Sequence, residues 1–341
     1  MKIHFDTDYM EGAHPTVMQR LLDTNLEQTP GYGTDNYCTE AKAKIRKACG
    51  NDNLDVHFLV GGTQTNSTVI DALLSHHEGV LAAETAHINV HESGAIESCG
   101  HKVLTLPSHA GKLDAKEVEA YIKDFYADET YEHMVAPGMV YISYPTEYGT
   151  LYSKEELQTL HAICKEADIP LYIDGARLGY GLSSDAADFT LEELPTLCDI
   201  FYIGGTKVGA MFGECVVAQP GLLKHFFPLI KQHGALMAKG RLLGVQFGTL
   251  FTDGLYLKIA RHAVEMAMIL KQGFIAKGFT PFIDSPTNQQ FFTLPNDVMD
   301  RLAEKATFEV WGSRGATHTN VRFVTSWAAK QEDVEALIAA I

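Results

Sequence analysis

The sequence predicts an α/β protein with a mostly parallel sheet of seven strands, covering helices and a smaller α+β domain at its C-terminal end. From about residue 53 to residue 220, short β-rich runs alternate with helical patterns, which is the order that builds parallel sheets. These runs are continuously apolar, as expected for strands that are buried on both faces. After Gly278 the order changes to strand, helix, two strands and helix, which predicts the second domain.

The strands of the sheet are expected at seven apolar runs, which are Val56–Val60, Val80–Ala83, Lys102–Leu106, Met139–Ser143, Leu171–Ile173, Phe201–Ile203 and Cys215–Ala218. Between the fourth and fifth runs, Ser153-Lys-Glu-Glu156 has the pattern of a capping box, so a helix is expected to begin there. The helix is expected to end before Pro170. Its apolar stripe consists of Leu157, Leu160, Ile163 and Ala167.

The C-terminal part of the chain has a different order. Residues 235 to about 277 read as two longer helices that are broken near Thr252-Asp-Gly254. A strand at Gln290–Thr293, a helix over Asp297–Lys305, two more strands and a last helix from Glu332 follow. We therefore expect a large domain over residues 1–250 and a small domain over residues 251–341. Residues 1–15 form an N-terminal arm that can pack on the small domain.

Charge and composition narrow the classes of function. The 341-residue chain has a formal net charge of −16, which argues against nucleic acid and anionic membrane surfaces as partners. The first residues show no apolar signal sequence, and no apolar stretch is long enough to cross a bilayer. The six cysteines are scattered without a CxxC pair, which is typical of reduced thiols, so we expect a cytoplasmic protein.

A glycine-containing turn directly follows the first predicted strand. In Gly61-Gly-Thr-Gln-Thr-Asn66 the glycines let the backbone turn tightly, and the N–H groups that follow can bind a phosphate at the start of a helix. Thr63 can add a hydroxyl donor. The alternative is an ordinary strand-to-helix turn in which Thr63 is the N-cap. The segment matches neither GxGxxG nor GxxxxGK(S/T), so the dinucleotide-binding and P-loop interpretations lose their main support.

Two charged residues lie at the ends of predicted strands. Asp174 ends the run that begins at Pro170, and Lys207 follows the run that begins at Ile200. A buried carboxylate and a buried ammonium each need a partner. Pyridoxal phosphate supplies both, because a lysine forms an imine with its aldehyde and an aspartate holds a proton on its pyridine nitrogen. Taken singly, Asp174 could instead cap a helix or pair with Arg177, and Lys207 could be a surface residue.

Small residues beside these two charges leave room for a flat ring. Gly175 and Ala176 follow the aspartate directly, and Gly204 and Gly205 precede the lysine, so a ligand can approach the backbone closely. Thr206, next to the lysine, offers a further hydroxyl to a phosphate. The joint pattern therefore favours a ring pocket over two unrelated charges.

One histidine follows a predicted strand where a parallel sheet places ligand contacts. His87 lies just beyond the run Val80–Ala83, and a neutral imidazole there can stack on a heteroaromatic ring and act as acid or base. The alternative is a hydrogen-bonded structural histidine. His87 and His91 have a metal-like helical spacing, but no third ligand lies nearby in the sequence, so we assign no metal site.

These residues resemble those of fold-type-I pyridoxal-phosphate enzymes, and the chain looks most like the threonine aldolase and β-eliminating lyase group. The matching motifs occur in that family's order and rough spacing, and they are Gly62-Thr63, Ala86-His87, Asp174-Gly-Ala-Arg177 and Thr206-Lys207. The resemblance runs over nearly the whole chain, from Tyr32-Gly33 to Thr287-Asn288 and Val321-Arg-Phe-Val-Thr325. It implies the fold-type-I transferase-like architecture.

The resemblance also implies how the cofactor is held. Pyridoxal 5'-phosphate would form a Schiff base on Lys207, Asp174 would be the partner of its pyridine nitrogen, and His87 would stack on its ring. The remaining cofactor contacts that it implies are Gly62, Thr63, Ala176 and Thr206.

For the substrate, the resemblance implies that Arg177 and Arg322 bind a carboxylate, a task that suits the planar guanidinium group. Thr7 stands where the family usually has a serine near this carboxylate. Tyr32 would line the site from a neighbouring subunit, because the family builds its sites at a dimer interface. We therefore expect a homodimer or homotetramer with shared active sites that acts on a small amino acid.

Two positions depart from the family pattern. Threonine aldolases usually carry a second histidine in a Thr-His-Asn segment, where this chain has Tyr144-Pro-Thr-Glu147. Glu147, or a water molecule, could take the place of the missing imidazole. The serine that usually precedes the lysine is here Thr206.

The expected activity is a retro-aldol cleavage of a β-hydroxy-α-amino acid to glycine and an aldehyde, as in L-threonine aldolases. The expected catalytic residues are Lys207, His87, Asp174 and Glu147. The alternatives are β-elimination, racemisation or transamination by the same cofactor, and a non-catalytic binding protein that kept the fold.

Overall fold

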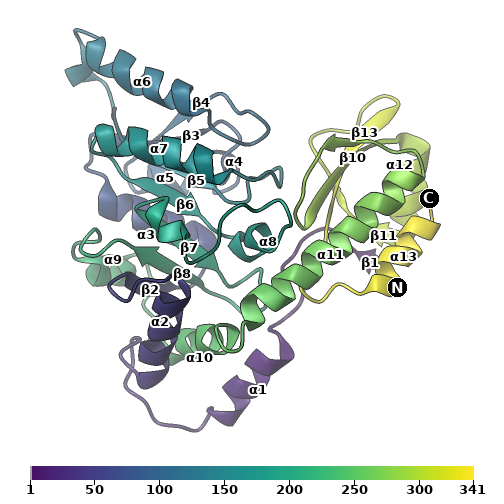
Figure 1. Ribbon diagram of the computed structural model, residues 1–341, viewed down its shortest axis with the longest axis horizontal. Helices are drawn as coiled ribbons and strands as arrows, with labels where there is room; N and C mark the ends of the chain where they lie inside the picture. Colours follow the sequence, from purple (N-terminus) through teal and green to yellow (C-terminus); the bar gives the residue numbers. More distant parts are fainter. Residues whose placement is uncertain (1) are drawn as a thin grey trace.

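A sheet of seven strands forms the centre of one lobe of the computed structural model, which describes residues 2–341 (Figure 1). Its strands lie in the order β2-β8-β7-β6-β5-β3-β4. They are β2 (Asp55–Leu59), β3 (Glu78–Ala83), β4 (Lys102–Leu106), β5 (Ala136–Ser143), β6 (Leu171–Asp174), β7 (Ile200–Gly204) and β8 (Glu214–Ala218). β8 runs antiparallel to both of its neighbours, and the other adjacent strands pair in parallel. The predicted mostly parallel sheet is confirmed, and each predicted apolar run falls on one strand.

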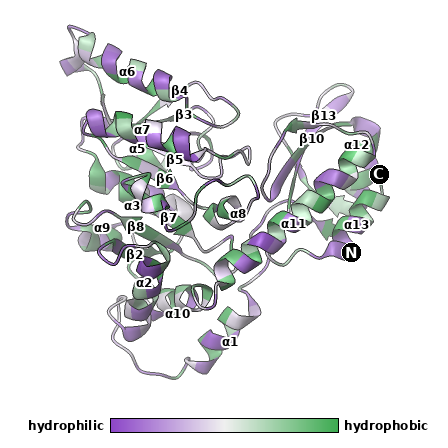
Figure 2. Ribbon diagram, viewed as in Figure 1, coloured by the Kyte–Doolittle hydropathy of each residue, from purple (hydrophilic) through white to green (hydrophobic). Residues whose placement is uncertain are grey.

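Helices cover this sheet, and the apolar character of its strands follows from that cover. Every residue of β6, β7 and β8 is buried, and Figure 2 shows the strands of this lobe mostly in hydrophobic colours. The helices of this lobe are α1 (Pro15–Asp23), α2 (Asn36–Ala48), α3 (Gly62–Leu73), α4 (His87–Val90), α5 (Ala95–Ser98), α6 (Ala115–Ala127), α7 (Lys154–Glu166), α8 (Leu178–Leu182), α9 (Phe226–Gln232) and α10 (Arg241–Leu250).

The predicted capping box begins α7. The Ser153 side chain accepts a hydrogen bond from the Glu156 N–H at 3.1 Å, and the Glu156 carboxylate accepts one from the Ser153 N–H at 2.6 Å. Leu157 and Leu160 are buried and belong to the hydrophobic core around the large sheet. The helix ends at Glu166, so the chain can turn into β6, which carries Asp174 at its end.

A single long helix, α11 (Leu255–Ala276), joins the two lobes (Figure 1). It is separated from α10 at Gly254, which has the positive φ of +70° that glycine tolerates. Residues from Tyr256 to Val264 belong to the core of the large sheet, whereas Met266, Leu270 and Phe274 belong to the core of the second lobe. The helix therefore contributes to both hydrophobic cores.

The second lobe is built on an antiparallel sheet in the order β12-β13-β10-β9. Its elements are β9 (Pro281–Ile283), β10 (Gln289–Pro295), α12 (Asn296–Lys305), β11 (Ala306–Thr307), β12 (Glu309–Val310), β13 (His318–Val324) and α13 (Gln331–Ala339). The N-terminal strand β1 (Ile3–His4) pairs in parallel with β11, and Phe5 is buried in this lobe's core. The chain then crosses to α1 in the large lobe, as the purple segment in Figure 1 shows.

Helix length and hydropathy also bear on membranes. Among residues 2–341, no helix combines the length and the apolar character that crossing a bilayer requires.

Candidate active site

The residues of the candidate site lie at the carboxyl ends of the parallel strands, where such sheets bind their ligands. Asp174 is the last residue of β6, and Lys207 follows the end of β7 by three residues. His87 begins α4 just after β3, and Glu147 lies in the loop that follows β5. The topology therefore brings four separate sequence segments to one edge of the sheet.

Asp174 is fully buried and is held as a carboxylate. Its Oδ2 accepts hydrogen bonds from the Tyr141 hydroxyl at 2.6 Å and the Asn66 amide at 2.9 Å, and its Oδ1 accepts the Ala176 N–H at 2.9 Å. Burial acts to raise the pKa of Asp174, but nearby His87 and the hydrogen bonds outweigh it, so the pKa lies below its usual value. The side chain is thus prepared to face a cationic ring nitrogen.

Lys207 lies beside a buried carboxylate that the sequence did not reveal. Burial, reinforced by the Arg177 charge, lowers the pKa of Lys207 to about 8. Burial also raises the pKa of Glu214 to about 8, although Glu214 Oε2 accepts the Gly205 N–H at 3.0 Å. A lysine with a lowered pKa is more readily available as a neutral nucleophile.

The glycine turn ends at the N-terminus of α3. Gly61 is the N-cap, its backbone is extended, and no side chain caps the helix, so the alternative in which Thr63 is the N-cap is wrong. The N–H groups of Gly62 and Thr63 therefore remain available for an anion. Thr206 is less free than expected, because its hydroxyl accepts the Gly213 N–H at 3.0 Å and also hydrogen-bonds with Glu214.

These groups line one cavity of about 340 Å³, which suits a small cofactor. Its lining includes all the predicted cofactor residues, which are Gly62, Thr63, His87, Asp174, Ala176, Thr206 and Lys207. A Cβ atom on Gly175 would come within 1.8 Å of the Tyr202 carbonyl oxygen, and one on Gly204 within 2.2 Å of the Ala176 carbonyl oxygen. Only glycine allows these strand ends to lie so close, and the residues present fit pyridoxal phosphate.

His87 is oriented by a carboxylate that sequence reasoning missed. Its Nδ1 lies 2.7 Å from Oε1 of Glu92, whose side chain is completely buried. The same oxygen accepts the Asn66 amide at 2.8 Å, so Asn66 links Glu92 to Asp174. When Nδ1–H of a neutral His87 ring donates to Glu92, the other ring nitrogen can accept a proton. The only sequence signal was an acidic residue five positions after the histidine.

Glu147 lies next to His87 and lines the cavity. Its Oε1 accepts the His87 backbone N–H at 3.0 Å and the Ser143 hydroxyl at 2.6 Å. Burial raises the pKa of Glu147 above its usual value. A carboxylate with a raised pKa is a stronger base than a solvated one, so this side chain can exchange protons with a ligand in the cavity.

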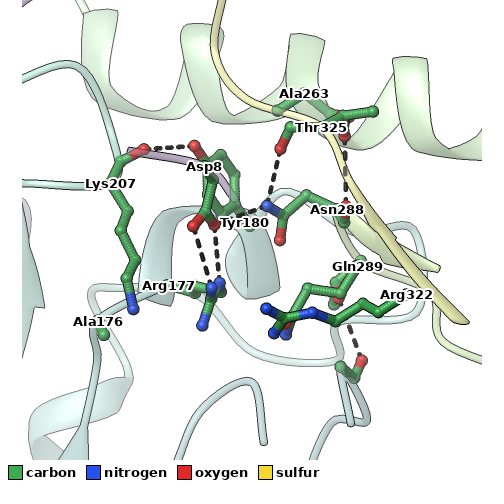
Figure 3. A network of polar contacts seen from close by, with 12 residues as sticks. Asp8, Ala176, Arg177, Tyr180, Lys207, Ala263, Asn288, Gln289, Arg322 and Thr325 are labelled. Atoms are coloured by element: carbon green, nitrogen blue, oxygen red, sulfur yellow. Dashed lines mark hydrogen bonds and ion pairs between the residues drawn. The ribbon is translucent and has the colours of Figure 1, made fainter. Parts of the chain in front are cut away.

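A second cavity of about 550 Å³ adjoins the first and contains both predicted arginines. Arg177 is paired on one edge with the buried Asp8, through Nε at 2.7 Å and Nη2 at 3.0 Å. Asp8 also accepts the Asn288 amide at 2.9 Å, so one carboxylate from the N-terminal arm contacts both lobes (Figure 3). The sequence did not single out Asp8.

Arg322 reaches the same cavity from β13. Its Nη1 donates to Gln289 at 2.8 Å, its Nη2 pairs with Glu309, and its guanidinium lies 5.0 Å from the ring centre of Trp311. Figure 3 shows the Arg322 and Arg177 side chains extending toward one another from different lobes. The two cations face one space, as a site for an anionic group requires.

Of the other predicted substrate residues, Thr7 lines this cavity and Tyr32 does not. Tyr32 lies on the surface with a positive φ of +58°, and its ring is covered by the Lys231 ammonium at 4.5 Å. Within this single chain Tyr32 is therefore separate from the cavity that the other predicted residues share.

Comparison with known proteins gives consistent matches over the whole chain. The β-eliminating lyase family model matches residues 4–294. The low specificity L-threonine aldolase of a Pseudomonas species is 30% identical, over 99% of this chain and 96% of its own length, and that of Pseudomonas aeruginosa is 28% identical over 98% and 95%. A solved threonine aldolase from Leishmania major is 40% identical with a TM-score of 0.95, covering 99% of this chain and 98% of that chain. An aspartate aminotransferase from Thermus thermophilus, at 16% identity and a TM-score of 0.74, shares the fold.

Proposed function

Because the chain belongs to the β-eliminating lyase family, we propose that it is a pyridoxal-phosphate-dependent lyase that cleaves β-hydroxy-α-amino acids of the L-threonine type. The products are glycine and an aldehyde. One observation carries this proposal: a pocket lined by the residues expected to hold the cofactor adjoins a cavity that contains a pair of cations. The linings of both cavities include Lys207, His87, Glu147 and Arg177. The relatives named as threonine aldolases, matched over the whole chain, support the choice of reaction.

When bound, pyridoxal phosphate supplies an electron-accepting ring joined to the substrate nitrogen. We assign the covalent attachment point to Lys207, whose pKa of about 8 favours the neutral amine. Asp174, with its lowered pKa, would hold a proton at the ring nitrogen. His87 would cover one face of the ring, and the N–H groups at the start of α3 would hold the phosphate together with Thr63. Thr206 would join them by exchanging its hydrogen bond with Glu214 for one to the phosphate.

The substrate is oriented by its carboxylate. Arg177 and Arg322 bind this group, and Thr7 lies beside it. Arg177 uses its Nε and Nη2 for Asp8, which leaves its Nη1 side free for the substrate. With the carboxylate fixed, the β-hydroxyl is directed toward the wall that carries His87 and Glu147.

We assign proton transfer at the β-hydroxyl to His87 and Glu147. The ring nitrogen of His87 that does not face Glu92 accepts the proton, directly or through a water that it orients. Glu147, adjacent through its hydrogen bond with the His87 backbone, contributes the acid–base capacity for which the family usually uses a second histidine. These side chains would hold the β-hydroxyl proton while the Cα–Cβ bond is cleaved, and Cα would gain a proton when glycine is released.

An assay of the products tests the reaction. The cofactor-loaded protein is incubated with threonine, allo-threonine and phenylserine, and aldehyde and glycine are measured together with ammonia and keto acid. Equal amounts of aldehyde and glycine are expected. Ammonia with a keto acid would instead identify β-elimination, and a keto acid without ammonia would identify transamination. The same Asp174 and Lys207 could support both reactions. A protein that shows no shifted visible absorption band with pyridoxal phosphate would be a non-catalytic relative.

We further propose a large domain over residues 1–250 and a small one over residues 251–341. The two cores that α11 joins support two domains, with residues Tyr256–Val264 of α11 packed in the large core. Self-association as a homodimer or homotetramer is proposed as well, with Tyr32 reaching a neighbour's site. The exposure of Tyr32, away from its own chain's cavity, supports this assignment. Light scattering and mixed oligomers of Tyr32→Phe and Lys207→Ala chains test this self-association.

We also propose a cytoplasmic location, which the six free cysteines favour.

A further inference from the structure

Arg322, the small-domain cation of the site, already has an anionic partner in this chain. Glu309 lies directly opposite Arg322 in the register between β12 and β13, and its carboxylate pairs with Nη2 of the guanidinium. Both side chains line the cavity that also contains Lys207 and Arg177. A substrate carboxylate that approaches Arg322 therefore meets a group with which Glu309 already interacts.

The exposure of the two partners shows which one can leave. The Arg322 side chain is 12% exposed, whereas the Glu309 side chain is 41% exposed. A carboxylate with that much access to water regains most of its solvation when it moves away, so separating the pair costs little. Asp8 differs in this respect, because it is fully buried and grips Arg177 through two hydrogen bonds.

Arg322 does not depend on Glu309 for its orientation. Gln289 accepts a hydrogen bond from Nη1 at 2.8 Å, and the Trp311 ring lies against the guanidinium at 5.0 Å. Trp311 is itself packed against Phe291 and Tyr148. The guanidinium can therefore keep its place when the Glu309 carboxylate is removed or displaced.

We propose that Glu309 is an internal anion that occupies Arg322 in the empty site and is displaced by the carboxylate of the incoming amino acid. Its charge opposes a second carboxylate in the same space, so Glu309 sets the affinity for the substrate and leaves the chemical step unchanged. The inference rests on the proposed function insofar as Arg322 binds the substrate carboxylate. Glu309 is in this sense a residue that determines how strongly amino acids bind.

The test compares the cofactor-loaded wild-type protein with Glu309→Gln, which keeps a hydrogen-bond acceptor for Arg322 and removes the charge. Glycine is titrated into each protein by calorimetry and by visible absorption. We expect the glycine Kd to fall about two- to fivefold in E309Q, the range of a partly exposed ion pair, with kcat within about twofold. Asp300→Asn, which removes the carboxylate of an exposed ion pair with Arg314 outside the cavity, is the matched control and should leave the Kd unchanged.

Two further arms separate charge competition from other roles. Methylamine, which lacks a carboxylate, should bind E309Q and the wild type equally, and in an Arg322→Gln background the Glu309→Gln change should no longer tighten glycine binding. An unchanged or higher glycine Kd in E309Q would overturn the inference. Failure of the proposed function is a different result, namely no aldehyde from the wild type, and the glycine titration requires no cleavage.

Discussion

The two ends of the active site are held in different ways. At the cofactor end, Asp174 is buried and fixed by hydrogen bonds from Tyr141 and Asn66. At the substrate end, Arg322 extends from the small sheet and pairs with Glu309, which is partly exposed to water. The cofactor end is thus formed before a ligand arrives, whereas the substrate end can exchange partners. Changes at the first should affect chemistry, and changes at the second should affect binding.

The largest effect is expected from Lys207→Ala. The variant loses the amine that we propose to hold the cofactor, so aldehyde production should fall by more than about a thousandfold. The visible absorption band of the loaded protein should also be lost after gel filtration. Lys123→Ala, which removes an exposed lysine paired with Glu119, should keep both properties. A Lys207→Ala protein that cleaves threonine at the wild-type rate would rule out the proposed mechanism.

Asp174→Asn should follow, with a loss of kcat on the order of a hundredfold to a thousandfold, typical of a preorganised electrostatic group. Asparagine keeps the size of the side chain but cannot hold a proton on the ring nitrogen. The variant should still bind the cofactor, with a shifted absorption band. Asp185→Asn, at an exposed site paired with Arg261, is the control. Wild-type kcat in Asp174→Asn would show that this carboxylate has only a structural role.

Asp8→Asn tests the role of Arg177. This arginine is proposed to bind the substrate, but it is held by a buried partner, as the residues at the cofactor end are. Breaking the buried pair of Asp8 with Arg177 should lower the free energy of unfolding by about 3 kcal/mol and raise KM for the amino acid. Urea unfolding measures the first and steady-state kinetics the second. Loss of both pair members in an Asp8→Asn, Arg177→Gln protein should destabilise less than the sum of the single changes.

The pH dependence of this pair has a definite sign. Burial acts to raise the pKa of Asp8, but Arg177 and Lys207 outweigh it, so the pKa lies below the ordinary aspartate value of 3.8. The pair therefore contributes fully above about pH 4, and its contribution is lost as the pH falls through the lowered value. The stability difference between the wild type and Asp8→Asn should shrink in acid. A difference that grows in acid would contradict this assignment.

The fold could be predicted from the sequence because its signals are local. Every strand of the large sheet contains an apolar stretch, although β2 and β4 also carry partly or fully exposed residues. The Ser153–Glu156 capping box and the Gly254 break mark helix boundaries within a few residues. The helix α6 was not predicted. Its buried residues Val118, Ile122 and Phe125 follow the spacing of an amphipathic helix, so a local signal was present in the sequence. The reversed direction of β8 is set by tertiary pairing and has no local signal.

Asp174 and Lys207 were recognisable from the sequence as charges that follow apolar strands, and the structure brings both to one cavity. The supporting residues were not recognisable in this way, because they act through partners far along the chain. Asp8 meets Arg177 across 169 positions, and a hydrogen bond of that range leaves no periodic signal. Glu309 pairs with Arg322 only because β12 and β13 are in register. Residues such as Asp8 and Glu309, which set the charge environment of the predicted groups, can therefore be identified only once the fold is known.

The smallest effect concerns pH at Lys207. Burial, together with Arg177, lowers its pKa to about 8, so the neutral fraction of the amine should rise about tenfold between pH 7 and pH 9. Since the neutral amine is the nucleophile, the second-order rate at which the apoprotein captures pyridoxal phosphate should rise by a similar factor. Stopped-flow absorbance measures this rate. A rate that rises only toward pH 10, as for a solvated lysine, would mean that the cofactor end is far more hydrated than the burial of Lys207 and Glu214 implies.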